Sequence, residues 1–302
     1  MAGKVIAVSN MKGGVGKTAT VVMLAEALAA EDDKSVLVID LDAQANASIC
    51  FAGDANLAAL IEQGHTIDGY LDDFFFRGHH QIAFSHCIKS GISDVSHLGR
   101  KLSVALLASS PHLRLLEREL IFQLISLNYG FNAIVGRLLL LIQEQLRQSA
   151  ISYDYVLIDC PPDISALTEV SIRLADLVIV PTIPDFLSTY GLQAFCNSLW
   201  RGPLAQQSSL PPPKRLPHVL VTRRRSTREH ARTLIKMQNE RFAADPAFQL
   251  LRTEVPETAA IPEALSKTGT SPAFTSKWGR QVVTVLDKLV RETKEVLNGP
   301  YA

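Results

Sequence analysis

Residues Lys12 to Thr18 read KGGVGKT, and this stretch decides the fold. An apolar, β-branched run at 5–8 comes just before it, and a helix-favouring run at 21–30 comes just after it. Strand, glycine-rich turn and helix, in that order, form the context that a phosphate-binding loop requires. The glycines let the backbone curl around a polyphosphate, so that successive N–H groups and the helix N-terminus point at it. The predicted nucleotide contacts are Lys12, Gly13, Gly14, Val15, Gly16, Lys17, Thr18 and Ala19.

Two residues of this loop have roles that follow from the pattern. Lys17 is placed to reach the β and γ phosphates of ATP, and the Thr18 hydroxyl is placed to bind Mg²⁺. The loop also departs from the usual pattern G-x-x-x-x-G-K-[ST]. Met11 stands where the first glycine belongs, and Lys12 follows it as a second lysine. A solvated loop lysine is the plain alternative for Lys12.

Composition limits the classes of protein to consider. The chain has 302 residues, of which 47% are hydrophobic and 20% charged, and its formal net charge is zero. A nucleic-acid surface must therefore be a local patch. The four cysteines are far apart and form no C-x-x-C pair, which favours reduced thiols over zinc or disulfides. The N-terminal residues resemble no signal peptide and the apolar runs are too short to span a bilayer, so we expect a cytoplasmic protein without membrane contact.

The rest of the chain alternates strands with helices. Continuous apolar runs at 36–40, 155–159 and 177–180 are typical of strands buried on both faces of a parallel sheet. Helical spacing follows at 113–124, 132–148, 189–200, 228–242 and 276–297. This alternation predicts a doubly wound, mostly parallel α/β sheet with helices on both faces, in one domain over 1–302. Residues 53–100 are harder to interpret, and we expect short helices and irregular structure there.

Acidic residues end two of the predicted strands. Asp40 closes the strand at 36–40 and Asp42 follows it, while Asp159 closes the strand at 155–159 before two prolines. In an open α/β sheet, ligands bind at the carboxyl ends of the strands. Asp159 has the layout of a Walker B acid that holds a Mg²⁺-bound water. Capping of a following helix or loop is the alternative for each carboxylate.

A basic segment lies late in the chain. Residues 214–241 contain nine Lys or Arg and two Glu, in a chain whose total charge is zero. Spacing at i, i+4 puts Arg228 and Arg232 on one helix face. Such a patch binds phosphate backbones without reading bases, although a solvated face is the alternative. The predicted DNA contacts are Arg223, Arg224, Arg225, Arg228, Arg232, Lys277 and Arg280.

These motifs together resemble the ParA/Soj/MinD family of deviant Walker A ATPases. The resemblance covers most of the chain and is weakest across 53–100. It rests on the loop KGGVGKT and on D-L-D-A-Q-A-N at 40–46, L-L-A-S-S-P at 106–111, Y-D-Y-V-L-I-D-C-P-P at 153–162, V-P-T-I-P at 180–184 and the stretch 253–266. The loop begins twelve residues from the start, as in the small ParA type without an N-terminal helix-turn-helix. The last helix mixes acidic and basic residues opposite its apolar stripe, which argues against a MinD-type membrane helix.

The resemblance implies a mechanism. Lys12 would cross a dimer interface to the phosphates of the partner subunit, like an arginine finger. Asp42 would position the attacking water, and Asp40 would sit near Mg²⁺ through a water. Family members usually read D-x-D-P-Q-G-N, whereas this chain has Ala43 and Ala45, which leaves the rigidity of this loop and the hydrolysis rate open.

Two functions remain open from sequence. In the first, an ATP-bound homodimer binds DNA non-specifically at the nucleoid, and a ParB-like or cargo adaptor protein stimulates hydrolysis. In the second, a ParA-like regulatory ATPase positions a protein complex for cellulose secretion, chemotaxis or pilus assembly, and DNA binding is incidental. A metabolic P-loop ligase or metal-cluster carrier is disfavoured by Lys12 and by the cysteine spacing.

Overall fold

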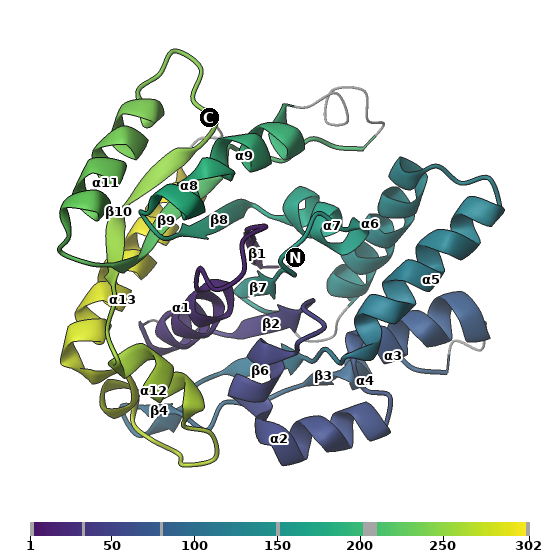
Figure 1. Cartoon of the computed structure of the whole chain (residues 1–302). Helices are drawn as coiled ribbons and strands as arrows, with labels where there is room; N and C mark the ends of the chain where they lie inside the picture. Colours follow the sequence, from purple (N-terminus) through teal and green to yellow (C-terminus); the bar gives the residue numbers. More distant parts are fainter. Residues whose placement is uncertain (1–2, 32–33, 79–80, 149–151, 202–209, 300–302) are drawn as a thin grey trace.

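A computed structural model gives the structure of the protein, and it describes residues 3–31, 34–78, 81–148, 152–201 and 210–299. Its centre is an eight-stranded sheet in the order β10-β9-β8-β1-β7-β2-β6-β3 (Figure 1). Every pair of neighbours is parallel except β3 and β6, so the predicted doubly wound, mostly parallel sheet is confirmed. The strands are β1 (Lys4–Val8), β2 (Val36–Asp40), β3 (Ile88–Lys89), β6 (Val104–Leu107), β7 (Tyr155–Asp159), β8 (Leu177–Thr182), β9 (His218–Arg224) and β10 (Gln249–Pro256). A separate hairpin joins β4 (Ser96–His97) to β5 (Arg100–Lys101).

Helices cover both faces of this sheet, because alternate strand residues point to opposite sides. Val5 and Ala7 belong to one buried cluster, and Ile6 and Val8 belong to the other. The first face carries α3 (Ile67–Asp72), α4 (Phe84–Cys87), α5 (His112–Ser126), α6 (Phe131–Gln148), α7 (Ala166–Leu174), α9 (Leu192–Trp200) and α11 (Arg228–Arg241). The second carries α1 (Lys17–Glu31), α2 (Asn46–Glu62), α12 (Ala260–Ser266) and α13 (Phe274–Asn298).

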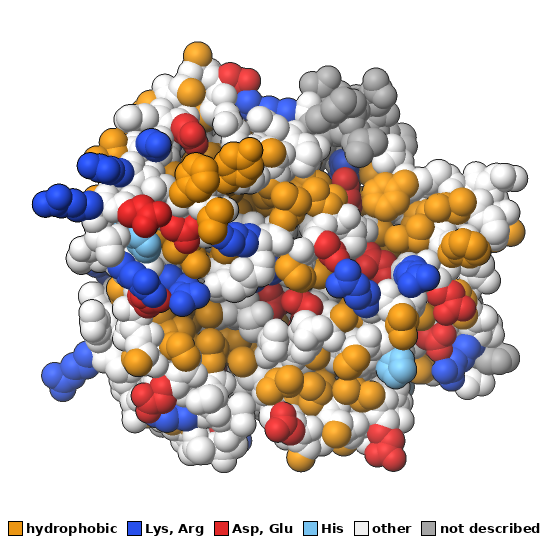
Figure 2. All heavy atoms as spheres, viewed as in Figure 1, with side chains coloured by type: hydrophobic (Ala, Val, Ile, Leu, Met, Phe, Trp, Pro, Cys, Tyr) orange, Lys and Arg blue, Asp and Glu red, His pale blue; other side chains and the backbone are white. Residues whose placement is uncertain are grey.

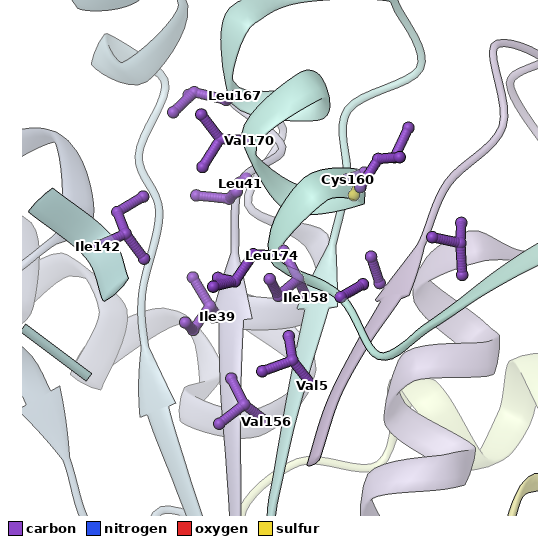
Figure 3. Close-up of a cluster of buried hydrophobic side chains, with 14 of the residues drawn as sticks. Val5, Ile39, Leu41, Ile142, Val156, Ile158, Cys160, Leu167, Val170 and Leu174 are labelled. Atoms are coloured by element: carbon purple, nitrogen blue, oxygen red, sulfur yellow. The ribbon is translucent and has the colours of Figure 1, made fainter. Parts of the chain in front are cut away.

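Side chains from several elements pack around β7 on the first face. Figure 3 shows Val156 and Ile158 of β7 among side chains of β1, β2, α6 and α7. Cys160 follows β7 directly and is fully buried, and burial raises the pKa of its thiol to about 12. This thiol therefore acts as a small packing group.

Three segments differ from the expected elements. The irregular segment begins later than predicted, because α2 runs from Asn46 to Glu62 with a break at Gly53, where φ is +70°. A π-helix, η1 (Asp73–Arg77), contains Phe74, Phe75 and Phe76. The predicted helix at 189–200 is divided into α8 (Phe186–Tyr190) and α9. Gly279 breaks α13 with a φ of +71°, a conformation that glycine adopts without steric cost. The prolines within 202–217 predict a surface loop, and residues 202–209 of it lie outside the described residues.

Candidate nucleotide-binding site

The phosphate loop lies between β1 and α1, at the carboxyl edge of the sheet. Gly14 and Gly16 have φ values of +75° and +92°, which favour glycine, and a Cβ added at Gly13 or Gly14 would point into open space. Asn10 holds the start of the loop, because its side-chain amide donates to the carbonyl of Pro181 at 2.8 Å and its Oδ1 accepts from the N–H of Lys12. Thr222 holds the other side by donating to the carbonyl of Val15 at 2.7 Å. The loop is thus fixed by strands β8 and β9 in an open, glycine-lined shape.

Lys17 lies beneath this loop and is 7% exposed. Its Nζ donates to the carbonyls of Asn10 and Lys12, at 3.0 and 3.2 Å, and no carboxylate of the described residues lies within ion-pair distance of it. Burial lowers the pKa of Lys17, and the charges of Asp159 and Asp42 partly offset that effect. A buried cation that has only carbonyl partners is suited to receive phosphate oxygens.

The acids predicted at the strand ends are brought together here. Asp40 and Asp159 are direct neighbours in the β2–β7 register, and both are fully buried. Oδ2 of Asp159 accepts from the Thr18 hydroxyl at 2.7 Å, while Oδ1 of Asp159 has no hydrogen-bond partner among the described residues. Burial, and next the charge of Asp40, raise the pKa of Asp159 well above its ordinary value. A buried, unpartnered carboxylate oxygen beside a threonine hydroxyl fits Mg²⁺, which would reverse this pKa shift.

Asp40 and Asp42 have different surroundings. Asp40 accepts from the N–H of Ser48 at 2.8 Å and from its hydroxyl at 2.7 Å, and also from the N–H of Asp42. Asp40 thus binds the first turn of α2, in line with the capping alternative, and burial raises its pKa to about 6. Among the described residues, the side chain of Asp42 accepts from the N–H of Gln44 through Oδ1, and the residue is 9% exposed. Its charge partly offsets the effect of burial on the pKa of Lys17, so this carboxylate lies near the phosphate loop.

Ala45 carries strain in the loop after β2. Its φ of +51° and ψ of +32° lie in the left-handed region, which costs a residue with a Cβ about 1 kcal/mol. It stands at the position where the resembled family usually has glycine. Alanine in place of that glycine therefore keeps the turn and adds backbone strain to it.

Lys12 does not point at the phosphate site of its own subunit. Its Nζ donates to the Ser188 hydroxyl at 2.9 Å and lies 3.9 Å from Oδ1 of Asp185. The same Asp185 oxygen caps α8 by accepting from the N–H of Ser188. Lys12 is thus held at the rim of the loop by α8, with 38% of its side chain exposed.

A cavity of about 480 Å³ beside the loop was not predicted from the sequence. It lies between α1, α12 and the ends of β9 and β10, and most of its lining is apolar. Its lining includes Gly16, Met23, Thr222, Pro256, Ile261 and Pro262. An apolar slot adjoining a phosphate loop fits the base of a nucleotide. The stretch 253–266, which the resemblance includes, supplies much of this wall.

The predicted DNA contacts fall into three groups. Arg228 and Arg232 of α11 and Arg280 of α13 are exposed and form no ion pair with a described residue. Arg223 and Arg225 pair with Glu257, and Arg224 pairs with Glu254. In Figure 2 the Lys and Arg side chains on the α11 side of the molecule are interleaved with acidic ones.

Lys277 requires a correction. Its side chain is 2% exposed and lies 2.6 Å from Oε1 of Glu26, whose other oxygen accepts from the indole of Trp278. This buried pair joins α13 to α1, so Lys277 is not available to DNA in this structure. The sequence showed a lysine at a helix start but not the buried acid 251 residues away.

The sequence is also similar to known proteins. A family model, the AAA_31 family of AAA domains, matches residues 3–201. The chain belongs to this family. Its curated relatives include the chromosome partitioning protein ParA of Myxococcus xanthus, 28% identical over 197 residues, which are 65% of this chain and 58% of that protein. The sporulation initiation inhibitor protein Soj of Bacillus subtilis is 29% identical, over 65% of each chain. The chain thus spans less than two thirds of the length of these relatives.

Solved structures share the AAA_31 fold over nearly the whole chain. An ATP complex of McdA from Cyanothece superposes with a TM-score of 0.68 and 17% identity, covering 99% of this chain and 98% of that one. A plasmid partition protein from Borrelia burgdorferi gives 0.63 at 16% identity, covering 98% and 99%. Cobyrinic acid a,c-diamide synthase from Mycobacterium smegmatis, solved with ADP and magnesium, gives 0.65 at 23%, covering 99% of each chain. The same fold therefore carries different functions, and the site must decide between them.

Proposed function

We propose that this protein is an ATP-driven partition or cargo-positioning switch. ATP and Mg²⁺ join two copies into a nucleotide-sandwich dimer, the dimer binds DNA non-specifically at the nucleoid, and a ParB-like or cargo adaptor protein stimulates hydrolysis. Lys17 binds the β and γ phosphates, Thr18 and Asp159 hold Mg²⁺ directly or through water, and Asp42 orients the attacking water. When bound, Mg²⁺ neutralises phosphate charge.

The orientation of Lys12 is the observation that carries this proposal. Lys17 already occupies the place under the loop where a cation meets the phosphates of its own subunit. The side chain of Lys12 is 38% exposed instead, and its Nζ contacts Ser188 and Asp185 at the start of α8 among the described residues. A cation at the rim of a phosphate site is placed to reach a nucleotide held by a second subunit.

Exposed apolar side chains near Lys12 support the same conclusion. Phe186, Leu187 and Tyr190 of α8 are 65%, 74% and 79% exposed, and Met11 of the loop is 39% exposed. Phe186 and Tyr190 also pack against each other with tilted rings, whose centroids are 5.8 Å apart. Large apolar groups that cluster on a surface mark an interaction site. We assign this face to the second copy of the chain.

The DNA surface is centred on α11. Thr227 caps this helix by accepting from the N–H of His230 at 3.2 Å, which fixes the direction of its first turn. Arg228 and Arg232 project from that turn and the next on one face, and both are exposed. Unpaired guanidinium groups in this arrangement bind phosphates without base contacts.

The decisive experiment is Lys12→Ala, followed by light scattering with ATP, with ADP and without nucleotide. The parent should dimerise with ATP, and the variant should stay monomeric while it still binds ATP within about threefold. Lys101→Ala removes an exposed lysine of the β4–β5 hairpin and should dimerise like the parent. A Lys12→Ala protein that dimerises with ATP as the parent does would disprove the trans role.

A second function, a regulatory ATPase that positions a protein complex, is favoured by one observation. Three of the predicted DNA arginines are already paired with Glu254 or Glu257, which reduces the free positive charge. DNA binding by anisotropy, with and without ATP, separates the two functions. DNA binding that depends on ATP supports partition or cargo positioning on DNA, and no binding in either state supports the regulatory function.

We find that none of the helices in the described part of the chain is both long and apolar enough to cross a membrane. The contacts proposed for this protein are ATP, Mg²⁺, a second copy of the chain, DNA and an adaptor protein.

A further inference from the structure

Glu257 lies where the base cavity meets the arginines at the end of β9. It follows β10 directly, and its N–H donates to the carbonyl of Arg224 at 3.0 Å. Glu257 and Arg223 are both among the residues that line the cavity. One acidic side chain thus belongs both to the wall of the nucleotide cavity and to the basic segment.

The carboxylate of Glu257 is occupied by two arginines. Oε1 accepts from Arg223 at 3.0 Å and from Arg225 at 2.8 Å, and Oε2 accepts from Arg225. These hydrogen bonds lower the pKa of Glu257 to about 2, so the carboxylate is charged at neutral pH. Two guanidinium groups that would otherwise be free for phosphates are therefore engaged within the chain, and one of their two positive charges is offset.

Arg223 also reaches the phosphate loop. Its guanidinium donates to the carbonyl of Gly14 at 3.4 Å, and its backbone has a φ of +49°. A left-handed conformation at a residue with a long side chain is strained and persists only where the surroundings impose it. The strand end is thus bent so that one arginine joins the loop, the cavity and Glu257.

The ion pairs of Glu257 are easily exchanged. The side chains of Arg223 and Arg225 are 51% and 58% exposed, and that of Glu257 is 28% exposed. Solvent-exposed ion pairs contribute little free energy, so a competing group displaces them at small cost. Both a nucleotide in the cavity and a phosphate backbone outside it are such competitors.

We propose that Glu257 is an internal competitor for DNA, which masks Arg223 and Arg225 until a nucleotide enters the cavity and moves its carboxylate. This inference rests on the proposed function and adds a route by which nucleotide binding exposes positive charge. Because coupling is reciprocal, DNA bound to these arginines should also tighten nucleotide binding.

The first test uses Glu257→Gln and measures binding of a double-stranded DNA by anisotropy, with and without ATP. Without nucleotide, the variant should bind roughly tenfold more tightly than the parent, and its log–log salt slope should be steeper by about 2, one unit for each freed arginine. With ATP the two proteins should bind alike. The gain caused by ATP is therefore smaller in the variant.

Glu229→Gln is the matched control, because it removes an exposed acidic residue from the first turn of α11 without releasing an arginine of β9. It should shift DNA binding equally with and without ATP. If Glu257→Gln behaves like Glu229→Gln while the parent responds to ATP, the masking role is overturned and the proposed function stands.

A second measurement needs no DNA, so it tests the masking role of Glu257 separately from the proposed DNA binding. Arg225→Ala leaves Glu257 held by Arg223 alone, and it should tighten binding of a fluorescent ATP analogue by about two- to fivefold. Arg291→Ala, an exposed arginine of α13, is the control and should leave this affinity unchanged. An Arg225→Ala protein with the affinity of the parent would overturn the masking role, whether or not the protein binds DNA.

Discussion

The phosphate end of this site and its arginine edge are built in opposite ways. At the phosphate end, Lys17 and Asp159 are buried, and backbone groups and a threonine hydroxyl fix their positions. At the arginine edge, Arg223 and Arg225 are exposed and held by one glutamate. Buried polar groups lose much free energy when a partner is removed, whereas exposed pairs lose little. In the proposed function, the groups for bond breaking are thus fixed in the core, while the groups that respond to partners lie where contacts exchange at small cost.

The largest expected effect lies at the phosphate end. Asp42→Ala should lower ATP turnover by about 100-fold or more, because the attacking water loses its acceptor. Binding of ATP should stay within about threefold, since Asp42 is not under the loop. Turnover measured by phosphate release, together with a fluorescent ATP titration, checks both parts. Turnover equal to that of the parent would remove Asp42 from the mechanism.

The arginines of α11, next to the arginine edge in the sequence, should show a smaller effect that depends on salt. Arg228→Glu combined with Arg232→Glu should weaken binding of double-stranded DNA by about tenfold or more at low salt, and it should reduce the salt slope by about 2. Nucleotide affinity should not change, because neither residue lines the cavity. Equal DNA binding by the parent and the double variant would place the DNA surface elsewhere.

Asp185→Asn tests the region where Lys12 is held. Asparagine keeps an oxygen that caps α8 but removes the negative charge near Lys12. The lysine is then easier to release, so the protein concentration for half-dimerisation with ATP should fall by about two- to fivefold. Asp54→Asn, at an exposed position of α2, should leave that concentration unchanged. Weaker dimerisation of Asp185→Asn would mean that Asp185 supports the dimer instead of opposing it.

The smallest effect concerns strain at the phosphate end. Ala45→Gly places glycine at a left-handed position, and it should raise the free energy of unfolding by about 0.5–1 kcal/mol. The larger freedom of glycine in the unfolded chain limits the gain. Denaturant unfolding measures it, and Ala47→Gly, inside α2, should be destabilising instead. A lower stability of Ala45→Gly would show that the alanine side chain contributes more by packing than it costs in strain.

Local patterns predicted the phosphate end well. The loop, the strands that end in Asp40 and Asp159, and the parallel sheet all follow from runs of a few residues whose geometry is fixed by the backbone. Parallel strands bring their carboxyl ends to one edge, so acids that are distant in sequence had to meet there.

The remaining features depend on contacts that no local pattern contains. Glu257 neutralises arginines 34 and 32 residues away, and Glu26 buries Lys277 across 251 residues. The base cavity forms only where α1, α12 and two strand ends converge. A count of positive residues therefore overestimated the free charge of the basic segment.

The central place of β1 also has a consequence for how the protein is made. This strand is synthesised first, yet its two neighbours in the sheet, β7 and β8, begin at Tyr155 and Leu177. While the first half of the chain emerges from the ribosome, both edges of β1 lack their partners. Pairings so distant in sequence are slow, and unpaired strand edges invite aggregation. After the loop that follows β1 is made, the ribosome must therefore add roughly 140 residues before the strand that bears Asp159 can pair with β1.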